Sequence, residues 1–335
     1  MVPLLSLCFF YSESKALAGS PSVEDVLRIL EMNGPQISEL ADGHPVLYNL
    51  NEVSADELAS GIAWYLPVPL PKVVAQLRVF KPDLLDVDVK AYGLLNENSK
   101  AESLPTGILS SEDTEAMLDV ESGSEFNLST QEIDSFKILK KSLNQNPSLP
   151  VRDAVAQRYR EILFERFDAY RRGGTNAIAG YARDDKTESK PATELRLASD
   201  ASTILANYFP HVHKVWQDYP KALPAGVTEI FPWITKKVEN RQAVILRHRI
   251  NIDWNGGLLI LTREFYAPHS YNSSQWITGC LPYREGTVIF QQVRSYTDQV
   301  AGVASNVKHI IGRKVLKEKM LKSFERLCAV LGQCH

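Results

Sequence analysis

Two residues in the last third of the sequence are best suited to chemistry. His248 alternates with aliphatic residues between positions 244 and 252, and this period of two predicts a strand with the imidazole on its apolar face. Arg263 stands in the same way among the apolar residues at 259, 261 and 265. A buried imidazole can act as an acid or a base near neutrality, and a buried guanidinium needs a carboxylate or a ligand beside it. Both residues are therefore candidates for a binding site.

The segment that follows Arg263 is the densest cluster of functional side chains in the chain. Its polar members are Glu264, Tyr266, His269 and Tyr271, and Arg294 and Asp298 follow at the end of the last predicted strand. Asp298 could pair with Arg263 or with Arg294. The cluster predicts either the polar end of a ligand site or a structural salt bridge with aromatic packing at a sheet edge.

No other motif indicates a binding site for a metal, a cofactor or a nucleotide. The sequence lacks G-x-S-x-G, H-E-x-x-H, C-x-x-C, G-x-G-x-x-G and a phosphate loop. His211 and His213 form an H-x-H in a segment that looks helical, where the two imidazoles point in different directions. Residues 83–134 hold thirteen Asp or Glu against two Lys, without the spacing of a calcium loop, so we interpret them as a solvated acidic face.

The elements that must position these residues form an antiparallel meander. Strands are predicted at 244–252, 258–266, 274–281 and 287–294, with Asn255-Gly256-Gly257 and Arg284-Glu285-Gly286 as turns. One long helix then spans about 305–331 and carries an apolar stripe. The sequence therefore predicts an α+β fold in which an antiparallel sheet is followed by a long C-terminal helix, with further helices in the N-terminal and middle parts.

This order of elements resembles the helix-grip arrangement of START-like lipid-binding domains. The resemblance covers roughly Val227 to Leu331, under a third of the chain, and rests on layout because no motif matches. It implies a curved sheet that wraps the last helix, with a ligand cavity between them. The middle helices from Val151 to Phe209 depart from a minimal domain of this kind.

The first part of the chain is predicted to pack with the rest as one unit. We assign residues 19–145 to an N-terminal α+β part with the acidic segment, and 146–335 to a helical segment followed by the sheet and last helix. Expected elements are a helix from Ser54 or Asp56 to about Tyr65, a hairpin over 117–128 around Ser122-Gly123-Ser124, and helices at 129–143, 151–172 and 193–208. The segment Lys72–Phe80 fits helix or strand.

Residues 1–18 are predicted to be a secretory signal peptide. A short apolar run, VPLLSLCFFY, is followed by Ala16-Leu17-Ala18, a pattern typical of a cleavage site, although no Lys or Arg precedes the run. We therefore expect a periplasmic or secreted protein, or a cytoplasmic one if the segment is a buried strand. After cleavage Cys280, Cys328 and Cys334 remain, and Cys328 and Cys334 could pair or stay reduced.

The composition excludes several classes of protein. Apolar residues make up 44% and charged residues 23%, as in globular proteins, and a net charge of −3 gives no sign of nucleic-acid binding. The last helix is an exception. It carries seven Lys or Arg against two Glu, which fits a solvated face or peripheral contact with an anionic membrane.

Three functions follow. The first is an exported protein that binds a hydrophobic or lipid-like small molecule between sheet and C-terminal helix, with Arg263, His248, Tyr266 or His269 at its polar head. The second is an enzyme with His248 or His269 as general base and Arg263 as anion binder. The third is a membrane-peripheral structural protein.

Overall fold

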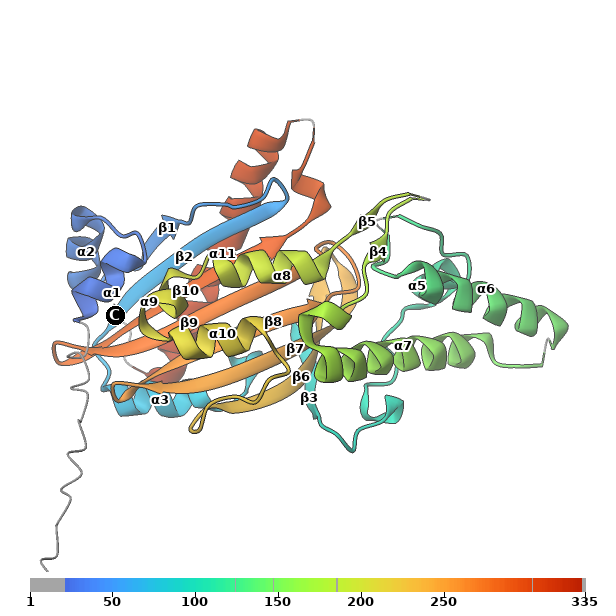
Figure 1. Ribbon diagram of the computed structural model, residues 1–335, viewed down its shortest axis with the longest axis horizontal. Coiled ribbons are helices and arrows are strands. Elements are labelled where there is room, and N and C mark those ends of the chain that lie inside the picture. Colours follow the sequence, from blue (N-terminus) through green and yellow to red (C-terminus); the bar gives the residue numbers. More distant parts are fainter. Residues whose placement is uncertain (1–21, 124, 147, 185, 303, 333–335) are drawn as a thin grey trace, which may run out of the picture.

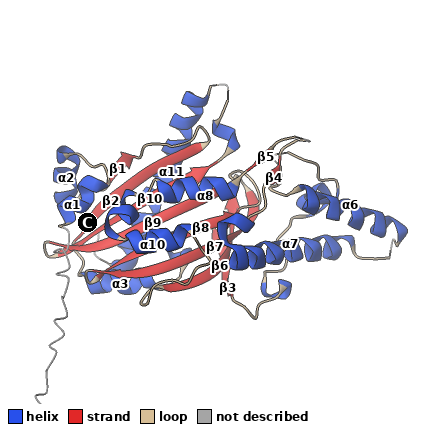
Figure 2. Ribbon diagram, viewed as in Figure 1, coloured by secondary structure: helices blue, strands red, loops and turns tan. Residues whose placement is uncertain are grey.

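The computed structural model describes residues 22–123, 125–146, 148–184, 186–302 and 304–332. The predicted signal peptide, residues 1–18, and Cys334 lie outside these ranges. The fold is α+β, as predicted: a large antiparallel sheet with helices on both faces (Figure 1, Figure 2). No helix in the described ranges is long and apolar enough to cross a membrane.

The main sheet has eight strands in the order β1-β2-β10-β9-β8-β7-β6-β3. Their bounds are β1 Val46–Asn49, β2 Glu57–Leu66, β3 Val89–Leu95, β6 Thr228–Val238, β7 Arg241–Trp254, β8 Gly257–Tyr266, β9 Ser273–Tyr283 and β10 Gly286–Tyr296. The predicted meander is its centre, β7 to β10. At the β7–β8 turn Asn255 and Gly256 both have positive φ, 52° and 79°, as a two-residue hairpin of this type requires. A two-stranded ribbon, β4 Tyr181–Ala182 and β5 Glu188–Ser189, lies apart.

One face of the sheet packs against the C-terminal helix. Helix α11 (Ser305–Leu331) lies with α3 (Leu70–Arg78) and α4 (Pro82–Leu85) over strands β2 and β8 to β10. The core on this side includes Ile62, Ile260, Ile289 and Phe324. We call this side the grip face.

The remaining helices lie on the opposite face, which we call the outer-helix face, or extend beyond its edge. Their bounds are α1 Val23–Ile29, α2 Gly34–Ala41, α5 Ser111–Leu118, α6 Thr130–Gln145, α7 Val151–Gly173, α8 Pro191–Asp200, α9 Thr203–Tyr208 and α10 Pro210–Gln217. Short 3₁₀ turns occupy Ala101–Ser103, Gly174–Ala177 and Asp298–Val300. In Figure 1, α8, α9 and α10 lie across the strands, while α6 and α7 extend to one side of the sheet. Both faces are therefore covered, which explains why most residues of β7 to β10 are buried.

Several expected elements differ in the structure. Most of the segment 54–65, expected to be a helix, belongs to strand β2, which begins at Glu57. A continuous run of buried residues, as at 57–63, occurs in buried strands and in buried helices, and the pairing of this segment with β10 makes it a strand. The hairpin expected over 117–128 is wrong, because Met117 belongs to helix α5 and the described residues of this segment, 117–123 and 125–128, contain no strand. The helix expected over 193–208 is broken at Ser202, whose side chain caps α9. Lys72–Phe80 falls mostly in helix α3.

Candidate functional site

The predicted site residues are divided between the two faces of the sheet. His248 and Arg263 are paired across β7 and β8 and are both fully buried. Their face is the outer-helix face, beneath α7, α8 and α10, and not the grip face where the sequence interpretation placed them. The alternation of apolar residues correctly predicted the two strands and the burial of both side chains. It does not indicate which face of the sheet the C-terminal helix covers. The expected use of these side chains in a cavity under that helix is therefore wrong.

His248 is the centre of a chain of polar groups that runs from the core to the surface. Its Nδ1 lies 2.9 Å from the Tyr170 hydroxyl, and its Nε2 lies 3.0 Å from Oε2 of Glu229. Burial lowers the pKa of His248 to about 4, although Glu229 opposes this shift. The imidazole is neutral at pH 7, so its one proton lies on Nε2 and is donated to the carboxylate, while Nδ1 accepts from Tyr170.

Arg263 lies at the buried end of the polar groups around His248. Among the described residues no carboxylate lies within 4.0 Å of its guanidinium. Its Nη2 donates to Ser199 Oγ at 2.9 Å, and its guanidinium stacks 4.0 Å above the Trp216 ring. Nη1 has no hydrogen-bond partner in the described part of the chain. Burial lowers the pKa of Arg263, and its positive charge offsets part of the burial-driven rise in the pKa of Tyr170. The guanidinium is therefore held by neutral groups in a packed core.

The other predicted residues form separate structural contacts. Tyr266 donates to or accepts from Tyr159 at 3.2 Å, beneath the Arg166 guanidinium. His269 contacts the Ser270 hydroxyl at 2.8 Å. Arg294 pairs with Glu57 at 2.6 Å.

Asp298 also has a partner that the sequence did not suggest. It pairs with Arg183 at 2.6 Å, so the expected pairing with Arg263 or Arg294 is wrong. Glu264 points to the grip face, where it accepts from Arg247 and, at 2.7 Å, from the Tyr271 hydroxyl. The eight predicted residues thus do not converge on one cleft.

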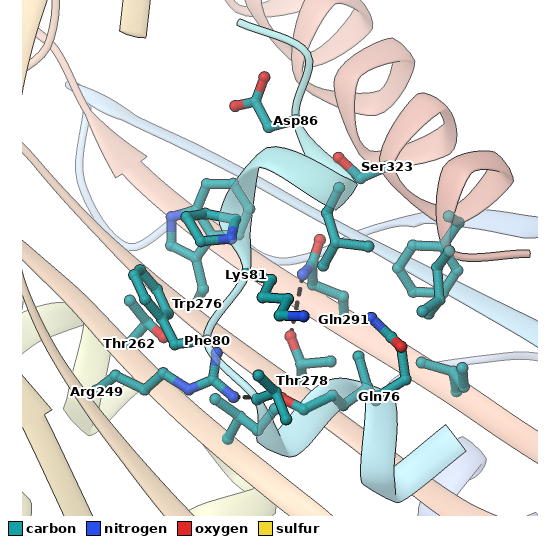
Figure 3. Close-up of a pocket in the computed structure, with 18 of the residues that line it drawn as sticks. Gln76, Phe80, Lys81, Asp86, Arg249, Thr262, Trp276, Thr278, Gln291 and Ser323 are labelled. Atoms are coloured by element: carbon teal, nitrogen blue, oxygen red, sulfur yellow. Dashed lines mark hydrogen bonds between the residues drawn. The ribbon is translucent and has the colours of Figure 1, made fainter. Parts of the chain in front are cut away.

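A cavity of about 140 Å³ lies on the grip face, between the sheet, the α3–α4 segment and α11 (Figure 3). Its apolar walls come from Leu77, Phe80, Pro82, Leu85, Ile260, Ile289, Phe324 and Leu327. Its polar groups come from the strands, chiefly Arg249, Thr262, Thr278 and Gln291, and from Gln76 and Lys81 on the α3–α4 side. Apolar walls with a few polar groups are typical of small-molecule sites.

The charged groups at this cavity are mostly cations. Arg247 is neutralised by Glu264, and Asp86 pairs with Lys236 at 2.6 Å. Burial raises the pKa of Asp86, but Lys236 outweighs it, and the net shift is downward. Arg249 and the exposed Lys81 have no carboxylate within 4.0 Å in the described ranges. The cavity therefore has two cations that form no ion pair within the described residues.

Arg249 is held in place without being neutralised. Its Nε donates to Asn251 Oδ1 at 3.0 Å, its Nη2 donates to the Leu77 carbonyl, and its guanidinium lies 5.7 Å from the Phe80 ring centre. Burial and the nearby Arg247 lower the pKa of Arg249 to about 10, so it stays charged at pH 7. A bound anion would offset a positive charge that the site keeps away from water.

Gln291 supplies an acceptor to the same cavity. Its Nε2 donates to Thr278 Oγ1 at 3.0 Å, while its buried Oε1 has no partner in the described residues. Such groups usually find a protein or water partner. The strand floor of the cavity therefore presents a cation on β7 and an unused acceptor on β10, with β8 and β9 between them.

Sequence reasoning missed these residues because Arg247 and Arg249 alternate with His248 and look like a solvent face. The signal that could have found them lies on the neighbouring strands. Ile260 and Ile289 belong to the same face and are apolar, which indicates that this face is also covered.

Comparison with known proteins adds little. No family model matches, and no curated protein matches. Among solved structures, one titled Crystal structure of Ara h 8.0201 matches with a TM-score of 0.23 and 13% identity over 30% of this chain. The match spans 65% of that chain, slightly under two thirds.

Proposed function

We propose that this protein binds a small amphipathic anion in the grip-face cavity. The ligand's apolar part would lie against Ile260, Ile289 and Leu327, and its anionic group would accept from Arg249, with Lys81 at the α3–α4 side. One observation carries the proposal. The Arg249 guanidinium is held by hydrogen bonds on the floor of an apolar hollow, and no carboxylate of the described residues pairs with it.

The size of the cavity limits the ligand. At about 140 Å³ it is close to the engineered apolar cavity of about 150 Å³ that binds benzene, and below the roughly 300 Å³ of a drug-sized site. A single ring or a short branched chain fits these dimensions. A long-chain lipid would leave most of its chain outside. We therefore narrow the lipid-like ligand expected from the sequence to a compact acid.

Calorimetry with phenylacetate and its uncharged amide tests the proposal. Wild-type protein should bind phenylacetate with a dissociation constant roughly in the micromolar to millimolar range, and the amide more weakly. Arg249→Met should weaken phenylacetate binding by about 2 kcal/mol, a typical value for a hydrogen bond to a charged group, and leave amide binding nearly unchanged.

Arg152→Met is the matched control, because Arg152 is an exposed arginine on α7. It should bind both compounds as the wild type does. Equal affinities of wild type and Arg249→Met for phenylacetate would reject Arg249 as the anion-binding group.

The proposed leader in residues 1–18 would place this binding outside the cytoplasm. Expression of the full chain followed by intact mass measurement of the mature protein tests this, because cleavage after Ala18 gives a defined new N-terminus. A mature mass that still includes residues 1–18 would contradict export by this route.

The enzyme alternative rests on a weaker geometry. Both ring nitrogens of His248 have partners, and the ring is fully buried. A substrate could therefore reach the hydrogen-bonded groups Tyr170, His248 and Glu229 only at Glu229. The side chain of Glu229 is 40% exposed and lines a hollow of about 490 Å³. Loss of a turnover in a His248→Gln variant, with ligand binding at the grip face retained, would favour this alternative.

A further inference from the structure

The first half of α11 shows an inverted pattern of polar and apolar residues. The buried residues of this helix, Met320, Phe324, Leu327, Cys328 and Leu331, all lie in its second half. In the first half, four β-branched side chains are exposed by 46 to 62%: Val307, Ile310, Ile311 and Val315. A helix on the surface of a globular protein normally turns its apolar side inward.

This half of the helix is attached to the protein by Leu316 and Gly312, which pack against the core and Leu58 respectively, and by several polar side chains. Nδ1 of His309 lies 2.8 Å from Glu52 Oε2, and Arg313 donates to the same oxygen at 2.9 Å. Lys317 donates to Asn49 at 2.8 Å. Because these three residues follow one another at a spacing of four, they occupy one side of the helix. Val307, Ile311 and Val315 share the same spacing and occupy the other side, and Ile310 lies between the two sides.

Four exposed lysines and one exposed carboxylate, Glu318, lie along the same stretch of α11 as the exposed aliphatic residues. Lys308, Lys314, Lys319 and Lys322 are all exposed, and none has a carboxylate within 4.0 Å in the described part of the chain. Figure 1 shows the start of α11 projecting beyond the sheet at the top of the view, so the surface is accessible. We call Val307, Ile310, Ile311 and Val315, with these four lysines, the α11 patch.

We propose that the α11 patch docks on an anionic lipid surface. Exposed aliphatic side chains beside lysines are typical of helices that lie in the headgroup region, where the lysines meet anionic lipids. A protein partner fits less well, because lysine is depleted in the core of protein interfaces, where aromatic residues, methionine and arginine are enriched. The α11 patch consists of valine, isoleucine and lysine.

Flotation with vesicles tests this docking. The full chain is mixed with vesicles of phosphatidylcholine alone, or with about one-fifth phosphatidylglycerol, from about 50 to about 500 mM NaCl. The wild type should float with the anionic vesicles only, and high salt should release it. Ile310→Ser combined with Ile311→Ser should reduce the bound fraction about tenfold. Lys314→Glu combined with Lys319→Glu should weaken binding by at least about fivefold per lysine.

Helix α6 offers a matched control. Ile138 is 68% exposed and Lys141 is exposed on the same helix, so Ile138→Ser combined with Lys141→Glu makes equivalent changes away from the α11 patch. This control should float as the wild type does. All variants should keep the thermal midpoint and the phenylacetate affinity of the wild type, which separates docking from the proposed cavity function.

Three results would overturn the proposal. The first is a wild type that does not float with anionic vesicles. The second is equal flotation of wild type and both patch variants, because the apolar residues 2–11 are the same in every variant and would then carry the binding. The third is a dimer in lipid-free solution that the patch variants abolish, with no vesicle binding, because the occupant would then be a second copy.

Discussion

Burial of a neutral His248 gives this protein a pH dependence that a single substitution should remove. The pKa of His248 is about 4 in the folded chain, against 6.5 for a free side chain. The unfolded chain therefore binds more protons between these values, and the free energy of unfolding falls as the pH is lowered through 6.5 toward 4. From about pH 7.5 to about pH 4.5 the loss is about 2 to 3 kcal/mol.

Other groups titrate in the same range, so the comparison between two proteins is the informative quantity. Glu194 is the strongest opposing group: burial raises its pKa to about 7 from 4.5, so it favours the folded state at low pH. His248→Gln keeps an amide that can donate to Glu229 and accept from Tyr170, without a proton to gain. The stability difference between wild type and this variant should therefore shift by about 2 to 3 kcal/mol in favour of the variant on acidification.

Urea unfolding followed by tryptophan fluorescence at both pH values measures this difference. If His248→Gln does not fold, the titration of the His248 Cε1 proton by NMR in the wild type gives the same information. A His248 pKa near 6.5, or parallel stability profiles of the two proteins, would refute the account of a desolvated imidazole.

Three further predictions follow from particular groups. The free energy of unfolding of Glu194→Gln should rise by about 2 to 3 kcal/mol relative to that of the wild type as the pH is raised from about 4.5 to about 8, because the buried carboxylate of the wild type then ionises. Urea unfolding at both pH values measures this difference, and an unchanged difference would contradict the prediction. Cys280 is buried and its pKa is raised to about 12, so peptide mapping should show it unmodified by iodoacetamide at about pH 8 until the protein unfolds; rapid alkylation of the native protein would contradict its burial. Ser323→Trp, at the α11 side of the cavity, should abolish phenylacetate binding by filling the hollow, and unchanged binding would place the ligand elsewhere.

The meander and the last helix could be predicted because their signals are local. Alternation along β7 and β8, the Asn255-Gly256-Gly257 turn, and the apolar stripe of α11 each lie within a short segment. The signals for helices α6 and α7 are equally local. Ser129 forms a capping box with Glu132 at the start of α6, and a glycine follows the last turn of α7.

The rest depends on contacts between distant segments. Strand β2 pairs with β10 more than 220 residues later, with Ala63 opposite Phe290, and no local pattern distinguishes its buried run from a buried helix. The candidate site was missed for the same reason. Whether Arg249 or His248 faces α11 depends on how that helix docks, and the two faces of β7 are both covered.

Two indole N–H signals provide the most direct test of the proposed binding site. Trp276 lines the grip-face cavity, with its Nε1 donating to Ser274 at 2.8 Å, whereas Trp216 lies on the opposite face against Arg263. On titration with phenylacetate, the Trp276 signal should move in a saturable way and the Trp216 signal should stay in place. Movement of Trp216 alone, or of neither indole at saturating ligand, would contradict binding beside Arg249.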